Sequence, residues 1–360
     1  MIERKNTYPV RIRDLYIGGD HPILVQSMTN THTEDIGSTV EQIRRLESAG
    51  CDIVRVSCYD SACSKAIRAI RDAVSLPLVA DIHFDYRLAI EAMENGADKI
   101  RFNPGNIGSE DRVRSLVDCA KQHHVPIRIG VNAGSLEKDL KERFGALSPE
   151  AMVESALRHI RLLEQQGFTD IVVSLKASDV TVMSKAYRTL SAIIDYPLHI
   201  GVTETGSVER GITKSCIGIG SLLLDGIGDT LRVSLTDDPV REVIVGKEIL
   251  RSIGLLKDDI EIISCPTCGR TQIDLKSIVE DLEKRLPRNK GYLKVAVMGC
   301  AVNGPGEASD ADIGIAFGKG NGVLFKNGRK LCSSDLPGIL DLLVSEVNKM
   351  LASTLERTGK

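Results

Sequence analysis

The sequence predicts an α/β fold in which a (β/α)8 barrel is followed by a smaller α+β domain. Over the first 252 residues, eight short β-branched runs alternate with amphipathic segments of helical spacing, a pattern typical of repeated strand–helix units. The chain has 42% hydrophobic residues, no tryptophan and 32 glycines, which favours an aliphatic parallel sheet. Eight units predict a closed barrel, with an open doubly wound sheet as the alternative.

Several of the predicted strands are preceded by the same short sequence pattern. A helix-ending glycine and an acidic residue precede the apolar run at Gly50, Gly96, Gly167 and Gly228, which suits a short loop between helix and strand. The eight strands are predicted at residues 23–28, 51–57, 78–82, 99–103, 127–131, 171–176, 198–203 and 230–235.

The repeating pattern ends after a predicted helix at residues 239–252. A polar segment around Lys257 follows, and we predict a domain boundary there, with one domain at 1–258 and a second at 259–360. The second domain is predicted to contain strands at 260–263, 294–298, 312–317 and 322–326, and helices at 273–286 and 336–350.

Composition and charge exclude several classes of protein. A net charge of −3 with mixed signs gives no broad basic surface for nucleic acid, and no apolar run approaches the length that spans a membrane. The first residues are charged and lack an apolar signal core, and nine cysteines are an odd number. We therefore expect a cytoplasmic protein with reduced thiols.

Polar side chains gather at the carboxyl ends of the predicted strands, where a parallel barrel places its reactive groups. Their two-residue spacing puts them on one face of each strand, which in a barrel is the interior. Five of them are cations: Arg55, Arg101, Arg128, Lys176 and Arg232. Because the nearby acids Asp81 and Glu204 cannot neutralise five cations, we predict a polyanionic ligand such as a diphosphate.

His83 follows Asp81 by two residues, at the end of the same predicted strand. A single histidine is more often a hydrogen-bonded core residue than a catalyst, but the neighbouring carboxylate favours a role in proton transfer. Glu204 is a candidate acid or base, because a carboxylate among cations can be tuned in either direction.

Cysteines in the second domain suggest an incomplete metal cage. Cys265 and Cys268 are separated by Pro-Thr, and Cys300 stands apart, with Glu307 and Asn303 as its nearest potential ligands. Three thiolates and one carboxylate fit zinc or an iron–sulfur cluster, and the absence of a second close Cys or His pair favours the cluster over structural zinc. Unligated buried cysteines are the third possibility.

Specific motifs in both domains resemble those of the bacterial hydroxymethylbutenyl diphosphate synthase family of the non-mevalonate (MEP) isoprenoid pathway. They are Ser264-Cys-Pro-Thr-Cys-Gly-Arg270, Met298-Gly-Cys-Ala-Val-Asn-Gly-Pro-Gly-Glu307, Val25-Gln-Ser-Met-Thr-Asn30, Ala80-Asp-Ile-His-Phe84, Arg101-Phe-Asn-Pro-Gly105 and Gly201-Val-Thr-Glu-Thr-Gly206.

The resemblance implies an oxidoreductase with a [4Fe-4S] cluster held by Cys265, Cys268, Cys300 and Glu307. It further implies reductive opening of 2-C-methyl-D-erythritol 2,4-cyclodiphosphate to 4-hydroxy-3-methylbut-2-enyl diphosphate, with two electrons from flavodoxin or ferredoxin. Matching positions place proton handling on Asp81, His83 and Glu204. They place substrate contacts on Arg55, Arg101, Asn103, Arg128, Asn132, Lys176, Thr203, Arg232 and Ser234.

We also predict a head-to-tail homodimer in which each cluster domain caps the barrel of the other subunit. The last barrel helix returns the chain to the amino-terminal face, and from Gly254 to Cys265 an extended chain reaches at most about 35 to 40 Å. A partner's domain is therefore the easier source of the cluster, as the resemblance also implies. The alternative function is a cluster-based or zinc-based sensor whose barrel only binds an anion, and a zinc-stabilised lyase is a further one.

Overall fold

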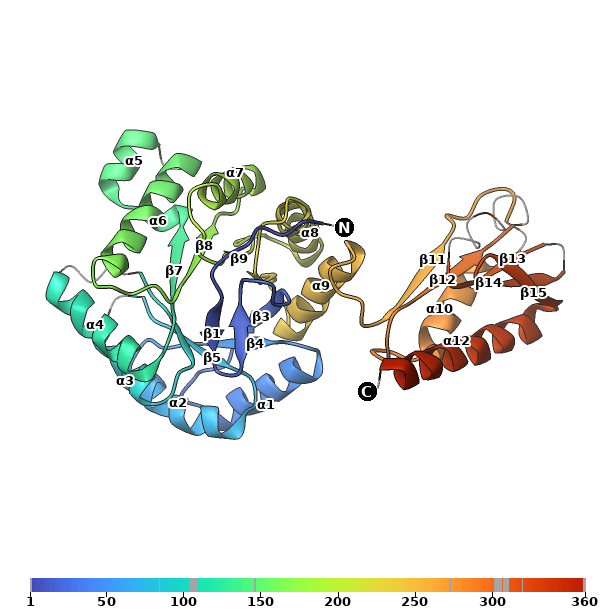
Figure 1. Ribbon diagram of the computed structural model, residues 1–360, viewed down its shortest axis with the longest axis horizontal. Helices are drawn as coiled ribbons and strands as arrows, with labels where there is room; N and C mark the ends of the chain where they lie inside the picture. The colour runs from blue at the N-terminus through green and yellow to red at the C-terminus, as the bar shows by residue number, and fades with distance from the viewer. Residues whose placement is uncertain are drawn as a thin grey trace. The chain divides into compact units, whose positions relative to one another are not determined.

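The computed structural model describes residues 2–83, 85–103, 109–145, 147–271, 273–300, 306, 311–318 and 320–358 (Figure 1). The chain forms two compact units, Met1–Leu255 and Leu256–Lys360. The predicted boundary at residue 259 and the division after Leu255 both fall in the segment between the last barrel helix and the next strand. Within the described residues, no helix combines the length and the apolar character that a membrane span requires.

The main sheet of the first unit has eight parallel strands, in the order β8-β7-β6-β5-β4-β3-β10-β9. A parallel bridge between Val173 and Leu198 joins the two ends of this order, so the sheet closes on itself. The predicted barrel is therefore confirmed, and the open sheet is excluded. The strands are β3 (Leu24–Met28), β4 (Ile53–Ser57), β5 (Leu78–Asp81), β6 (Lys99–Arg101), β7 (Ile127–Asn132), β8 (Ile171–Lys176), β9 (His199–Ile200) and β10 (Thr230–Leu231).

The last two barrel strands are shorter than predicted, because the backbones of β9 and β10 pair only briefly. Arg232 still donates its backbone N–H to the carbonyl of Ile200 (3.0 Å). Beyond this bond Gly201 lies so close to β10 that an added Cβ would be 2.5 Å from the carbonyl oxygen of Arg232. The polar residues that follow Ile200 and Leu231 thus lie on loops.

Helices cover the outside of the barrel, and most begin where an aspartate or serine caps the free backbone N–H groups of the first turn. They are α1 (Ile36–Ser48), α2 (Ser61–Ala73), α3 (Tyr86–Glu94), α4 (Glu110–His123), α6 (Pro149–Glu164), α7 (Val180–Ser191), α8 (Val208–Leu224) and α9 (Pro239–Ser252). A short additional helix, α5 (Lys138–Phe144), lies between β7 and α6.

An antiparallel hairpin precedes the barrel and was not predicted from the sequence. Its strands are β1 (Val10–Ile12) and β2 (Leu15–Ile17). Val10, Ile12 and Ile17 pack against the apolar residues at the beginnings of β3, β4, β5 and β8. The hairpin therefore closes the amino-terminal end of the barrel, and the polar residues at the carboxyl ends of the strands lie at the opposite end.

The second unit contains a five-stranded sheet in the order β11-β12-β13-β14-β15, in which the first three strands are parallel and the last two antiparallel. Helices α10 (Leu275–Arg285) and α12 (Leu336–Thr358) belong to it (Figure 1). Its apolar core joins residues of both helices to residues of the sheet. The strands are β11 (Ile260–Ser264), β12 (Leu293–Met298), β13 (Ile313–Phe317), β14 (Gly322–Lys326) and β15 (Arg329–Ser334), and only β15 was not predicted.

Candidate active site

The register of the barrel strands places predicted polar residues of neighbouring strands side by side. Asp81 on β5 pairs with Arg101 on β6, and Arg101 pairs with Arg128 on β7. Asn132 on β7 pairs with Lys176 on β8 in the same way. Because neighbours in parallel register end together, these side chains meet at the carboxyl end of the barrel.

A cavity of about 100 Å³ lies between these side chains. Nine of the residues predicted from the sequence line it, together with Ser174, which was not among the predicted substrate contacts. The lining residues are Arg55, Asp81, His83, Arg101, Arg128, Asn132, Ser174, Lys176, Thr203 and Arg232.

Arg101 is fixed from three sides. Its guanidinium donates to the carbonyl of Gly130 (Nη2 to O, 2.9 Å), approaches Asp81 (Nη1 to Oδ1, 3.3 Å), and contacts His83 (Nη1 to Nδ1, 3.0 Å). A guanidinium can only donate, so Nδ1 of His83 accepts in the shorter contact, while Nε2 lies 3.5 Å from the same Nη1. That Nε2 is 3.6 Å from Oδ2 of Asp81.

Asp81 is the single acid among the residues that line this cavity, and it faces both Arg101 and Arg55 (Nε to Oδ2, 3.7 Å). Although burial raises the pKa of Asp81, the nearby Arg55, His83 and Arg101 together hold this pKa well below its usual range. Asp81 is therefore an ionised counterion for two buried arginines.

Arg128 and Lys176 lack such a counterion among the cavity residues, and Arg55 shares Asp81 with Arg101. Burial is the main cause that lowers the pKa of Arg55 to about 10, and it lowers the pKa of Arg128 and Lys176 well below their usual values; neighbouring arginines add to each shift. Arg128 is fully buried, and its Nε and Nη1 make no hydrogen bond to any described residue. Such groups favour an anion that completes their hydrogen bonds.

Arg232 has a counterion that was not predicted from the sequence. Glu242, on α9, accepts from its Nε (to Oε2, 3.2 Å) and from its Nη2 (to Oε1, 3.2 Å). The same carboxylate accepts from the hydroxyl of Ser27 (3.1 Å) and the backbone N–H of Leu235 (3.0 Å). Glu242 is almost fully buried, so it holds Arg232 in a fixed position at the edge of the cavity.

Two more buried basic side chains were not singled out from the sequence. Lys99 lies two residues before Arg101 on β6, and His199 is on β9 with its Nδ1 2.8 Å from the hydroxyl of Thr230. Burial lowers the pKa of both well below the usual values, and the charge of Arg128 lowers them further. The alternation of inward-facing and outward-facing residues along β6 and β9 was the signal that could have identified them.

Three predicted residues do not line this cavity. The side-chain amide of Asn103 makes two hydrogen bonds to Gly130 on β7: its Oδ1 accepts from the backbone N–H (2.7 Å), and its Nδ2 donates to the carbonyl (2.8 Å). Asn103 therefore supports the backbone to which Arg101 is anchored. Ser234 offers its carbonyl to the hydroxyl of Thr205 (2.9 Å). Glu204 is exposed and has a φ of 54°, a left-handed conformation that is uncommon for glutamate.

Two of the predicted cluster ligands, Cys265 and Cys300, lie in the second unit close to the ends of neighbouring strands. Cys265 directly follows β11 and Cys300 follows β12, and these strands are paired in parallel. The backbone N–H of Gly299 donates to the sulfur of Cys265 (3.4 Å). Cys332 is on β15, at the opposite edge of the sheet.

Arg270 lies beside Cys268 and interacts electrostatically with Cys300. Hydrogen bonds from its backbone and side chain lower the pKa of Cys268, and the pKa of Arg270 is raised by Cys268 and then by Cys300. A cation beside two thiols favours thiolates, the form that binds soft metals. Among the described residues no three His, Cys, Asp or Glu side chains are grouped as a site for a single metal ion. Glu307 and Asn303 lie outside the described residues.

Comparison with known proteins places both units in one family. Residues 7–247 match the GcpE TIM-barrel domain, and residues 261–349 match the GcpE protein C-terminal domain. The chain belongs to the GcpE family. This membership confirms the resemblance that the sequence motifs indicated.

Curated GcpE relatives align over nearly the whole chain. The 4-hydroxy-3-methylbut-2-en-1-yl diphosphate synthase (flavodoxin) of Caldanaerobacter subterraneus subsp. tengcongensis is 57% identical over 97% of this chain and 98% of the relative. The protein of the same name from Fusobacterium nucleatum is 53% identical over 98% of each chain.

A solved dihydropteroate synthase from Yersinia pestis superposes with a TM-score of 0.50 at 13% identity, covering 68% of this chain and 98% of that chain. This likeness shows the barrel fold alone.

Proposed function

We propose that the chain is a 4-hydroxy-3-methylbut-2-en-1-yl diphosphate synthase that reductively opens 2-C-methyl-D-erythritol 2,4-cyclodiphosphate. In this reaction one C–O bond to the diphosphate breaks, one hydroxyl leaves as water and a C=C bond forms. Two electrons and two protons balance the equation. Reduced flavodoxin, which the relatives' name includes, is the proposed electron donor.

The observation that supports this proposal is the excess of positive charge in the barrel cavity. Five cations face one lining acid, and the second carboxylate, Glu242, is occupied by Arg232. A cyclic diphosphate supplies the charge and the acceptor oxygens that these donors lack. An uncharged sugar substrate would explain neither the excess of positive charge nor the donors that lack acceptors.

His83 is the better candidate for moving a proton at the mouth of the barrel. Asp81 is held ionised by its arginine neighbours, so it cannot donate a proton near neutral pH. His83 is 55% exposed, with its ring held between Arg101 and Asp81. In this proposal Asp81 orients the imidazole and the arginines, while His83 exchanges the proton; Glu204 remains a second candidate.

The cofactor in this proposal is a [4Fe-4S] cluster held by Cys265, Cys268, Cys300 and Glu307. The adjacent ends of β11 and β12 and the thiolate-favouring position of Arg270 support the fit of the three cysteines. Such a cluster would supply the electrons, and a carboxylate ligand would be more readily displaced from it than a thiolate. The residues of the barrel bind and orient the diphosphate and exchange protons.

We also propose that the enzyme works as a head-to-tail homodimer. The short segment between the end of α9 at Ser252 and the start of β11 at Ile260 supports this arrangement, because it limits where a chain can deliver its own cluster domain. The test mixes two inactive variants, Glu307→Ala and Arg101→Gln. Recovery of activity on subunit exchange is expected, and confirmed mixed dimers without activity would count against it.

The function is tested on anaerobically purified protein by iron and sulfide quantitation together with turnover of the cyclodiphosphate by reduced flavodoxin. The expected result is four irons per chain, from the proposed cluster stoichiometry, and diphosphate-product formation. Arg101→Gln should abolish turnover, whereas the exposed control Arg114→Gln should not. A loaded cluster without turnover under a strong reductant would instead favour the sensor function.

A further inference from the structure

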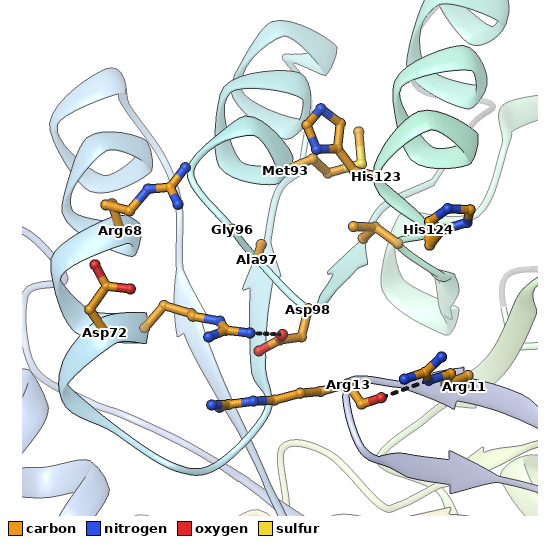
Figure 2. Close-up of a pocket in the computed structure, with 12 residues that line it drawn as sticks. Arg11, Arg13, Arg68, Asp72, Met93, Gly96, Ala97, Asp98, His123 and His124 are labelled. Carbon is orange, nitrogen blue, oxygen red and sulfur yellow. Dashed lines mark hydrogen bonds and ion pairs between the residues drawn. The ribbon is translucent and has the colours of Figure 1, made fainter.

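A second cavity, of about 530 Å³, lies at the amino-terminal ends of the barrel strands, away from the proposed active site (Figure 2). Its lining comes from the β1–β2 hairpin, from helix α2, and from the turns that precede β6 and β7. None of its residues belongs to the proposed catalytic or substrate-binding set. In Figure 2, Arg68 and Asp72 lie on one side, His123 and His124 on the other, and Arg11 and Arg13 along the lower edge.

Four arginines line this cavity, and each is held by a hydrogen bond that uses part of its guanidinium. Arg71 pairs with Asp98 (Nη2 to Oδ1, 3.3 Å), and Arg68 donates to the carbonyl of Glu94 (2.6 Å). Arg13 donates to the carbonyl of Ser75 (2.8 Å), while Nε of Arg11 donates to the carbonyl of Arg13 (2.8 Å).

A guanidinium has five N–H donors, so one such bond leaves several donors for a ligand. These hydrogen bonds orient the four groups in part, which lowers the side-chain entropy that binding costs.

The charges around the cavity do not balance. Four arginines and two aspartates, Asp72 and Asp98, line the cavity, and the carboxylate of Asp14 lies 3.8 Å from Nε of Arg13. Four cations against three carboxylates leave an excess of one positive charge, before the two histidines are counted. Asp98 is already engaged, because it accepts from Arg71 and from the backbone N–H of Leu78 (2.8 Å). Forked donors in excess of nearby carboxylates are the arrangement that recognises phosphate oxygens.

The volume of the cavity indicates the size of ligand that it can bind. Its volume lies within the range of about 300 to 1,000 Å³ that is typical of sites for organic molecules, and is large for a single inorganic phosphate. The floor includes the buried apolar side chains of Met93, Ala97 and Val125. The rim is charged and the floor is apolar, which suits a ligand with an anionic end and an organic body.

We propose that this cavity, which we call the amino-face site, binds an organic anion with two or more phosphate groups. The site is separate from the one that binds the cyclodiphosphate. Binding here leaves the carboxyl ends of the strands open, so the two ligands do not compete for the same side chains.

The test is calorimetric titration of the full-length protein with ATP as the probe. The background variant Arg101→Gln weakens the barrel site and so isolates the amino-face site. In that background, Arg11→Gln with Arg68→Gln should weaken ATP binding about tenfold or more, since each change removes a charge-assisted donor. The matched control is Arg161→Gln with Arg188→Gln, two exposed arginines outside the cavity.

Each possible result of the titration either supports the amino-face site or overturns it. Weaker binding in the Arg11 and Arg68 double variant, with unchanged binding in the control, supports the proposal. Equal affinity in both double variants, or no saturable ATP binding once Arg101 is replaced, overturns it. Saturation by inorganic phosphate at the same affinity as ATP overturns the requirement for two phosphate groups and an organic body.

Discussion

Replacement of Asp81 by asparagine tests whether one buried carboxylate holds the cationic cavity together. Asp81 lies 3.3 Å from Nη1 of Arg101 and 3.7 Å from Nε of Arg55. At an effective dielectric constant of about 20, these separations correspond to gross attractions of about 5 and about 4.5 kcal/mol. Most of this is offset by desolvation, and breaking a buried pair typically costs about 3 to 5 kcal/mol.

We therefore expect Asp81→Asn to lower the free energy of unfolding by about 3 kcal/mol. For a unit of this size, the loss corresponds to a Tm decrease of about 6 to 12 °C. The assay is thermal unfolding in a low-salt buffer without phosphate, with the exposed Asp118→Asn as control. Added inorganic diphosphate should recover more of the Tm in the Asp81 variant than in the wild type, because it replaces the missing counterion.

The counterion role of Asp81 also predicts that the stability difference between wild type and Asp81→Asn depends on pH. A carboxylate with a depressed folded-state pKa stabilises the protein above its unfolded pKa, near 4, and this contribution is lost as the pH falls towards the folded-state pKa. The difference in Tm between wild type and Asp81→Asn should thus shrink below about pH 4. A Tm loss no greater than that of the Asp118 control, with equal recovery by diphosphate, would refute the counterion role of Asp81.

Three further predictions concern the fixed positions of the cations. Burial lowers the pKa of Lys176, so diphosphate binding should raise this pKa and take up protons, measured by calorimetry in buffers of different ionisation enthalpy. Glu242→Asp keeps the charge but withdraws the carboxylate from Arg232, so KM should rise about fivefold or more while kcat changes less. Gly130→Ala should reduce kcat/KM by at least about tenfold, because an added Cβ would lie 2.4 Å from Nε of Arg101.

Each of these predictions has its own control. Lys176→Met corrects for protons exchanged by diphosphate itself, and equal uptake in both proteins would contradict the first. Glu248→Asp, an exposed change on the same helix, controls for the second, which fails if both variants share one KM. Gly134→Ala has open space around the added Cβ, and wild-type activity in Gly130→Ala would contradict the third.

Local patterns in the chain were sufficient to predict most of the architecture. A barrel strand is a short apolar run with alternating faces, so its position and its interior residues follow from a period of two. The strands carrying Arg55, Arg101 and Lys176 were identified in this way, and their side chains do line one cavity. The N-terminal hairpin and β15 were missed because short or exposed strands carry little periodic signal.

The assignment of roles within the site could not be predicted to the same extent. Asn103 was predicted to contact substrate, but in the structure it holds the backbone of Gly130. Glu242 was not predicted at all, since a carboxylate in the first turn of a helix looks like a response to the helix dipole. Only the folded chain places it against Arg232.

The sequence by itself determined the order of strands and helices, the excess of cations at the strand ends, and the spacing of the cysteines. These properties depend on neighbours in the chain. The tertiary structure alone decided which carboxylate neutralises which arginine, how Gly130 makes room for Arg101, and where the second group of arginines gathers at the amino-terminal face. Those contacts join residues far apart in sequence, and their energies depend on distance and burial that exist only once the barrel has closed.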